Sequence, residues 1–97
     1  MSSLLSSYET DYKSTLEQAR SSLKEAAGQP VAQRNSTLKQ IESQQEELYD
    51  LIDQMEIEVN NSITNSQDRA SYKAKLRDYK KQVQTTLKQP LQKLMDS

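Results

Sequence analysis

Three acidic side chains near the middle of the chain have a spacing that could hold a hard cation. Glu46, Asp50 and Asp53 fall on neighbouring turns of a helix, and carboxylate oxygens are the ligands that Ca²⁺ and Mg²⁺ prefer. Protein sites for these ions normally add loop carbonyls to the carboxylates, and acidic side chains on a helix most often form its solvated face. The sequence therefore predicts no metal site.

The residue types that most catalytic sites need are missing. The chain has no histidine and no cysteine, so it lacks the commonest general base, the strongest nucleophile and the best transition-metal ligands. Its single glycine cannot form a phosphate-binding loop. We therefore expect neither an enzyme nor a protein that binds a cofactor.

A basic run from Arg69 to Lys88 raises the question of nucleic acid binding. It holds seven bases and one acid, with Tyr72 and Tyr79 as candidates for stacking on bases. Both tyrosines are in helical phase with Leu76, however, which predicts that they belong to the core. The net charge is -1, and the basic residues do not border a free apolar face. The sequence predicts no nucleic acid binding and no direct membrane insertion.

The composition indicates one small domain with a thin core. The chain has 97 residues, of which 33% are hydrophobic, and its mean hydropathy is -0.97. Sustained helical periodicity argues against disorder, so the compatible architecture is a set of long helices that share a narrow apolar seam. No apolar run approaches the roughly 18 residues that span a bilayer, and the start of the chain is too polar for a signal peptide. We expect a soluble, cytosolic fragment.

The stretch from Leu38 to Ile63 is the segment with apolar residues on more than one helical face. Its main stripe has steps of three and four residues: Leu38, Ile41, Leu48, Ile52, Met55 and Val59, with Gln45 in the gap. Tyr49, Leu51 and Ile63 lie off this stripe, which predicts a central helix with neighbours on two sides. Gln45 is interpreted as a polar break that fixes the register of the helices, and a functional polar layer is the alternative.

Two helices are predicted on either side of the tripeptide Gly28-Gln29-Pro30. The first, at about 3–27, has one apolar face: Leu5, Tyr8, Tyr12, Leu16, Ala19, Leu23 and Ala26. Gly28 is expected to end it as a left-handed C′ residue, and Pro30 to open the second helix, which runs to about 63. The alternative is a later start of the second helix, after a second cap at Asn35 or Ser36. Such a short connection makes the two helices antiparallel neighbours.

A third helix is predicted at about 66–89, after a polar cluster that begins at Asn60. Asn65 or Ser66 is its expected N-cap. Because proline disfavours helix at the preceding residue, we expect an end or a kink near Gln89, with a kinked extension to about 95. The fold class is therefore all-α, an antiparallel up-down-up three-helix bundle. Its acidic middle helix, with seven acids from Glu42 to Glu58, would lie beside the basic third helix.

Several blocks of the sequence are characteristic: Gln33–Lys39, Glu47–Ile63, Tyr72–Lys81, Thr15–Ala19 and the pair Tyr8-Glu9. They resemble the N-terminal domain of the Vti-type Qb-SNAREs of fungi, over essentially the whole chain. The resemblance implies a three-helix Habc bundle, followed in such proteins by a SNARE motif and a C-terminal membrane anchor. A chain that stops at Ser97 would be the Habc domain alone.

The resemblance also implies a function in traffic among the Golgi, the endosome and the vacuole, on the cytosolic face of these membranes. The implied partners are an epsin-like adaptor with an ENTH domain and, through the SNARE motif, other SNAREs. On physical grounds we expect the adaptor to contact the turn after the second helix and the start of the third, where the polar candidates are Gln67, Asp68, Arg69 and Lys73. The alternative is that these residues merely cap and solubilise the helix.

Two other functions fit an all-helical chain of this length. One is a structural spacer such as a spectrin-like repeat, although those repeats usually carry a core tryptophan and this chain has none. The other is a coiled-coil module in which two or more open chains associate. A bundle that closes on itself predicts a monomer.

Overall fold

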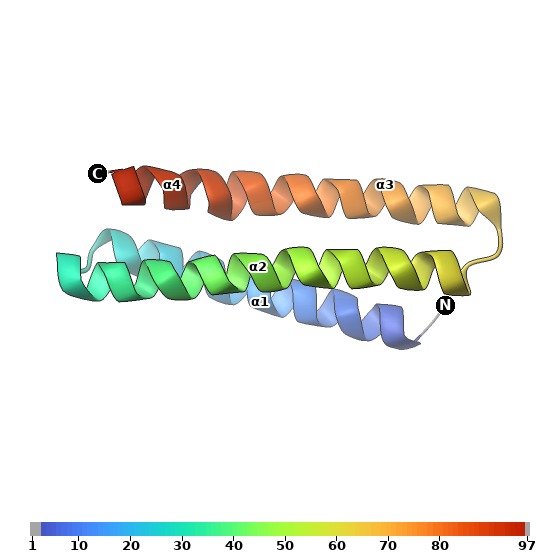
Figure 1. The fold of residues 1–97 in the computed structure, drawn as a ribbon, viewed down its shortest axis with the longest axis horizontal. Coiled ribbons are helices and arrows are strands. Elements are labelled where there is room, and N and C mark those ends of the chain that lie inside the picture. Colours follow the sequence, from blue (N-terminus) through green and yellow to red (C-terminus); the bar gives the residue numbers. More distant parts are fainter. Residues whose placement is uncertain (1–2, 97) are drawn as a thin grey trace.

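Three long helical segments pack side by side in the structure, a computed structural model that describes residues 3–96. They comprise α1 (Ser3–Ala27), α2 (Val31–Ser62) and a third segment built from α3 (Ser66–Val83), a π-helical turn η1 (Gln84–Lys88) and α4 (Gln89–Asp96). The bundle measures 51 × 20 × 15 Å, and the segments run up, down and up (Figure 1). The predicted antiparallel three-helix bundle is therefore confirmed.

The central position of α2 follows from its wide apolar face. Seven of its side chains are buried: Leu38, Ile41, Leu48, Leu51, Ile52, Met55 and Val59. Leu51 was predicted to lie off the main stripe, and its burial together with the half-buried Tyr49 and Ile63 shows that α2 has neighbours on two sides. The tyrosines of the basic run are also in the core, since Tyr72 is buried and Tyr79 packs against the same cluster.

Gln45 lies where the core divides into two clusters. Leu48, one turn after Gln45, belongs to the larger cluster, and Ile41, one turn before it, belongs to a smaller cluster with Ala26 and Leu91. The side chain is half-buried, and its Oε1 atom is buried without a hydrogen-bond partner among residues 3–96. The polar break predicted from the sequence is thus a real interruption of the apolar seam.

The connection between α1 and α2 is as short as predicted, but its geometry differs. Gly28 follows the end of α1 directly, and its N–H donates a hydrogen bond to the carbonyl oxygen of Glu25 at 3.0 Å. Its φ angle is not positive, so the predicted left-handed C′ conformation is wrong. A Cβ atom at Gly28 would meet the Glu25 oxygen at an ordinary 3.8 Å. The change of direction falls at Pro30, the residue before α2, whose ψ angle of 154° is extended.

The third segment stays helical through Pro90 and reaches Asp96 (Figure 1). The irregularity lies before Gln89, in η1, where the N–H of Gln89 donates to the carbonyl oxygen of Gln84, five residues back. Proline has no N–H for the carbonyl four residues earlier, and its ring clashes with that carbonyl in a regular α-helix. A wider turn directly before Pro90 relieves this conflict, so the helix continues where the sequence predicted an end or a kink.

The wider turn also keeps the apolar side chains in phase. Val83, Leu87 and Leu91 are all buried and follow each other in steps of four residues. In a regular α-helix of 3.6 residues per turn, two such steps would rotate the last side chain about 80° away from the first. A π turn holds more residues per turn, so η1 takes up part of this excess and Leu91 still faces the core.

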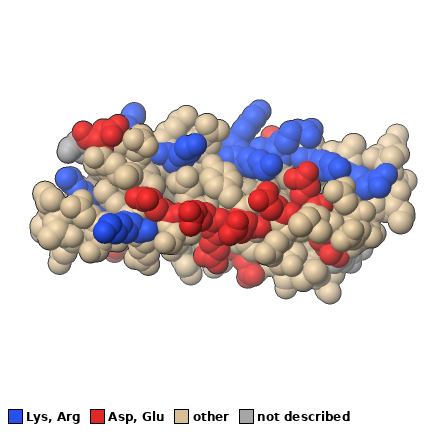
Figure 2. All heavy atoms as spheres, in the orientation of Figure 1, with Lys and Arg blue, Asp and Glu red and all other residues tan. Residues whose placement is uncertain are grey.

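The acidic and basic helices lie beside each other, as their sequences predicted. Figure 2 shows a band of Lys and Arg over the third segment next to a band of Asp and Glu over α2. Within residues 3–96, however, no carboxylate from Glu42 to Glu56 forms an ion pair with a base of the third segment. Exposed pairs gain only about 0–1 kcal/mol, so little stability is lost where these pairs do not form.

Candidate interaction surface at the turn between α2 and α3

The turn that joins α2 to α3 is held by hydrogen bonds at both helix ends. The N–H of Ile63 donates to the carbonyl oxygen of Val59 at 3.1 Å, which closes α2. The side chain of Asn65 then accepts from the backbone N–H groups of Gln67 at 2.9 Å and Asp68 at 3.1 Å. Asn65 is therefore the N-cap of α3, one of the two candidates from the sequence. Because both ends are fixed, side chains at this turn have defined directions.

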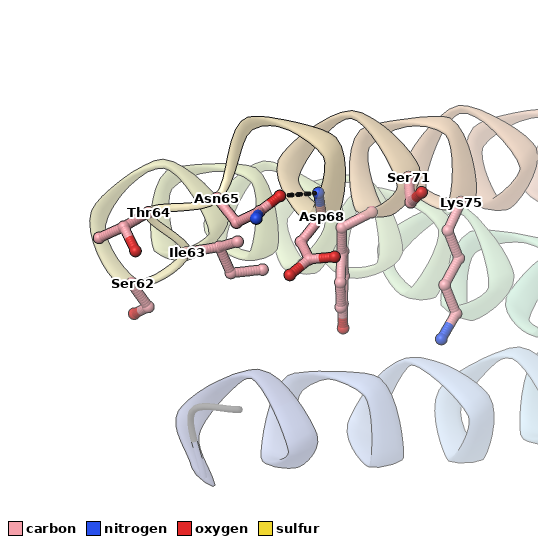
Figure 3. A pocket seen from close by; sticks show the side chains of 8 residues that line it. Ser62, Ile63, Thr64, Asn65, Asp68, Ser71 and Lys75 are labelled. Atoms are coloured by element: carbon pink, nitrogen blue, oxygen red, sulfur yellow. Dashed lines mark hydrogen bonds between the residues drawn. The ribbon is translucent and has the colours of Figure 1, made fainter.

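A groove of about 760 Å³ opens beside this turn, along one side of α3 (Figure 3). Its lining comes from the turn itself, Ser62 to Asn65, and from one side of α3: Asp68, Ser71, Tyr72 and Lys75. In the close-up, Lys75 extends from α3 toward α1. The groove thus combines a carboxylate, an ammonium group and hydroxyls with the apolar side chain of Ile63.

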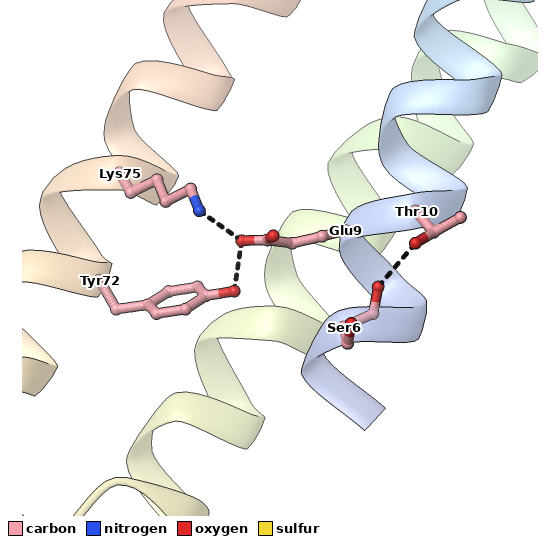
Figure 4. Close-up of polar contacts among 5 residues, drawn as sticks. All are labelled: Ser6, Glu9, Thr10, Tyr72 and Lys75. Carbon is pink, nitrogen blue, oxygen red and sulfur yellow. Dashed lines mark hydrogen bonds and ion pairs between the residues drawn. The ribbon is translucent and has the colours of Figure 1, made fainter. Parts of the chain in front are cut away.

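Glu9 of α1 connects this side of α3 to the rest of the bundle (Figure 4). Its Oε1 atom accepts a hydrogen bond from the hydroxyl of Tyr72 and lies 2.8 Å from Nζ of Lys75. The ammonium group also lies 5.3 Å from the centre of the Tyr72 ring and 5.9 Å from that of Tyr79, within the range of cation–π attraction. One carboxylate of α1 therefore fixes both the tyrosine and the lysine that line the groove.

These contacts shift the pKa values of the groups involved. Partial burial alone would raise the pKa of Glu9, but the hydrogen bonds from Lys75 and Tyr72 outweigh it and hold the pKa below the ordinary 4.5. The hydrogen bond to Glu9 raises the pKa of Lys75. Burial, followed by the contact with Glu9, raises the pKa of the Tyr72 hydroxyl. All three groups therefore keep their usual charge at neutral pH, and the contact is an ionised one.

Replacing Glu9 with glutamine is expected to lower the free energy of unfolding by about 1 kcal/mol at neutral pH, because Lys75 is half-exposed and the ion pair is partly screened. The folded-state pKa of Glu9 is depressed, so its stabilisation is complete above pH 4.5 and is lost as the pH falls through the folded-state value. Urea titrations of both proteins at neutral and acid pH should show the difference shrinking as the pH falls.

Glu17→Gln is the matched control, since Glu17 forms an exposed 3.3 Å pair with Arg20 on the same helix. Its effect should stay near zero at every pH. A Glu9→Gln effect that is independent of pH, or equal to that of the control, would show that the ionised contact contributes nothing.

The four residues predicted as a binding site do not share one face. Asp68 lines the groove, whereas Gln67, Arg69 and Lys73 do not. Gln67 is exposed at the first turn of α3, and Arg69 and Lys73 are half-buried one turn apart along α3. The structure thus separates a groove side of α3, with Asp68, from a second side with Arg69 and Lys73.

The groove residues that the sequence did not single out are Ser71, Tyr72 and Lys75 on α3, and Glu9 behind them. Tyr72 was assigned to the core, where its ring indeed lies, but its hydroxyl reaches Glu9 at the groove. Lys75 was counted only as one base of a run. The pairing of residues 9 and 75 depends on how α1 and α3 are rotated against each other, for which the sequence holds no local signal.

The arrangement of these groups fits recognition of another molecule by the outer surface of the bundle. Within residues 3–96, no group of three acidic side chains is placed to hold a metal ion, and no helix is long and apolar enough to cross a membrane. The groove beside the α2–α3 turn combines charged and hydroxyl groups with apolar side chains, and the interior of the bundle is filled by side chains. The fold and the surface define a small helical-bundle domain whose exposed faces are available for protein contacts.

Comparison with known proteins identifies the family. Residues 1–95 match the family model described as vesicle transport v-SNARE protein N-terminus. The chain is also 63% identical, over all its 97 residues, to the t-SNARE VTI1 of Saccharomyces cerevisiae. It belongs to this SNARE family and corresponds to the N-terminal domain of a Vti-type SNARE, as the sequence blocks predicted. Membership of a non-enzymatic family supports the prediction that the chain is not an enzyme.

The match has a defined extent. The chain spans 45% of the length of the yeast relative. Family membership assigns the chain to the N-terminal part of the vesicle-transport SNARE proteins.

Proposed function

We propose that this chain, as a single Habc-type domain over residues 1–97, is the docking domain of a SNARE that moves among the Golgi, the endosome and the vacuole. Its partner is an epsin-like adaptor with an ENTH domain, which sorts the SNARE into vesicles from the cytosolic face of these membranes. Family membership supports the SNARE context. The observation that carries the docking role is a rigid, exposed turn with charged groups in fixed directions.

The beginning of α3 is suited to docking because its polar groups are ordered before a partner arrives. Asn65 fixes the first turn, and Glu9 fixes Lys75. Pre-ordered side chains lose less conformational freedom on binding, so more of their interaction energy appears as affinity. The mixed signs of Asp68 and Arg69 would favour a partner surface that carries both charges, which supports specificity.

Reversing the charge of Arg69 and Lys73 together is expected to weaken adaptor binding by about tenfold or more, because like charges facing each other across an interface are costly. Isothermal titration calorimetry of the chain with a purified ENTH-domain adaptor measures this directly. Lys80→Glu with Lys81→Glu is the control, since it makes the same charge change at exposed positions on α3 farther from the turn.

Asp68→Lys separates the two sides of α3. If the adaptor covers the groove, this variant should weaken binding as much as the double reversal does, and if the adaptor covers only the other side it should have little effect. Unchanged affinity in all three variants would place the adaptor elsewhere on the bundle.

Sedimentation should show a monomer at micromolar concentration, and a dimer would instead favour the coiled-coil alternative.

A further inference from the structure

A second groove lies at the other end of the bundle from the α2–α3 turn. It has a volume of about 560 Å³ and runs between the last turns of α1 and the η1–α4 segment. These two elements lie together at the end where the chain turns into α2 (Figure 1). The apolar part of its lining consists of Leu23 and Ala27 from α1 and Pro90 and Leu94 from α4. The proposed adaptor surface uses none of these residues.

The charged side chains of this groove are mostly positive. Arg20 and Lys24, one turn apart on α1, and Lys93 on α4 line it together with a single acid, Glu17. Glu17 is engaged by Arg20 at 3.3 Å. Within residues 3–96 neither Lys24 nor Lys93 forms an ion pair, and both are exposed. Two ammonium groups from two different elements are therefore available on the rim of a groove that also contains apolar side chains.

The irregular turn η1 forms one wall of the groove. Thr86 and Pro90 both contribute to the lining. Because Pro90 has no N–H, the carbonyl of Thr86 lacks the donor that a regular α-helix would provide four residues later. This wall therefore departs from a regular α-helix where it borders the cations of the rim. Irregular π turns within helices are often found at functional sites.

We propose that this groove binds an acidic peptide segment that carries apolar side chains, presented by a partner protein. The carboxylates of the segment would contact Lys24 and Lys93, and its apolar side chains would cover Leu23 and Leu94. An anionic membrane suits the groove less well. The large exposed apolar side chains of the bundle, Leu4, Val31, Ile57 and Met95, do not line it, and Leu23 and Leu94 are half-buried rather than projecting.

The test uses the whole chain labelled with ¹⁵N and a short synthetic peptide rich in Asp, Glu and Leu as the probe. At low salt the peptide should shift the backbone amide signals of Lys24, Thr86 and Leu94 more than those of the α2–α3 turn. Lys24→Glu with Lys93→Glu should weaken binding by about tenfold, and added salt should weaken it in the parent chain. Adaptor affinity should stay unchanged in this variant, which keeps the two proposed surfaces distinguishable.

Arg77→Glu with Lys81→Glu is the control, because it makes the same charge change at exposed positions outside the groove. If the control weakens peptide binding equally, the attraction is non-specific and the proposal fails. It also fails if the peptide shifts other amides or none. A parallel titration uses vesicles that contain phosphatidylserine. If the vesicles shift the same amide signals and the peptide does not, the groove binds an anionic membrane surface and the peptide proposal is wrong. Circular dichroism confirms that each variant is folded.

Discussion

Replacing Ile52 with alanine is expected to lower the free energy of unfolding by about 3 kcal/mol, the largest effect of any single change considered for this bundle. Ile52 is fully buried in the middle of α2, within the larger core cluster. The truncation removes apolar contacts and leaves a cavity that three packed helices cannot close completely. Urea unfolding followed by far-ultraviolet circular dichroism measures the change.

Ile57→Ala provides a control with the same chemical change on the same helix. Ile57 is 60% exposed, so its truncation should leave stability unchanged or raise it by a few tenths of a kcal/mol, since alanine is the better helix former. Equal losses at positions 52 and 57 would mean that the chain does not bury the face of α2 that contains Ile52.

Replacing Gln45 with leucine is expected to raise the free energy of unfolding by about 1–2 kcal/mol. The Oε1 atom of Gln45 is buried without a partner among residues 3–96, so the substitution removes an unfavourable desolvation. Leucine would also connect the cluster of Leu48 with the cluster of Ile41, which Gln45 now divides. The gain is measured by the same urea titration.

Gln54→Leu is the control, because Gln54 is exposed on the same helix and should give almost no gain. A loss of stability in Gln45→Leu would show that the amide makes favourable contacts, and would support a functional polar layer over a simple break in the seam. The register interpretation adds a second expectation for Gln45→Leu. Without the polar residue the helices can pack in more than one register, so hydrogen exchange should protect the core amides of the variant less uniformly than those of the parent chain.

Most of the fold could be predicted because it depends on local patterns. Steps of three and four residues on α2 placed Ile41, Ile52 and Met55 in the core, where the structure has them fully buried. The N-cap Asn65 was recognisable from its residue type just before a helical pattern. These features depend on neighbours within one or two turns, so sequence alone is sufficient.

The features that could not be predicted depend on how elements meet. Pro90 alone predicted an end or a kink, because the benefit of keeping Leu91 in the core becomes visible only when α1 and α2 are in place. In the candidate site, sequence placed Asp68, Arg69 and Lys73 together at the start of the third helix but could not show that only Asp68 lines the groove. The ion pair between Glu9 and Lys75 likewise depends on the relative rotation of α1 and α3, which two turns and the whole of α2 separate in the chain.

The aromatic contacts between the outer helices have a spectroscopic consequence. Tyr12 of α1 stacks on Tyr79 of α3 with ring centres 4.3 Å apart, and its hydroxyl donates to Gln82 at 2.8 Å. The chain has five tyrosines and no tryptophan, so its intrinsic fluorescence arises from phenol rings alone. The stacked pair joins rings from the first and third helices, so separating these helices changes the surroundings of two of the five emitting rings. The protein thus carries a built-in optical reporter of bundle opening, with no dye or added label required.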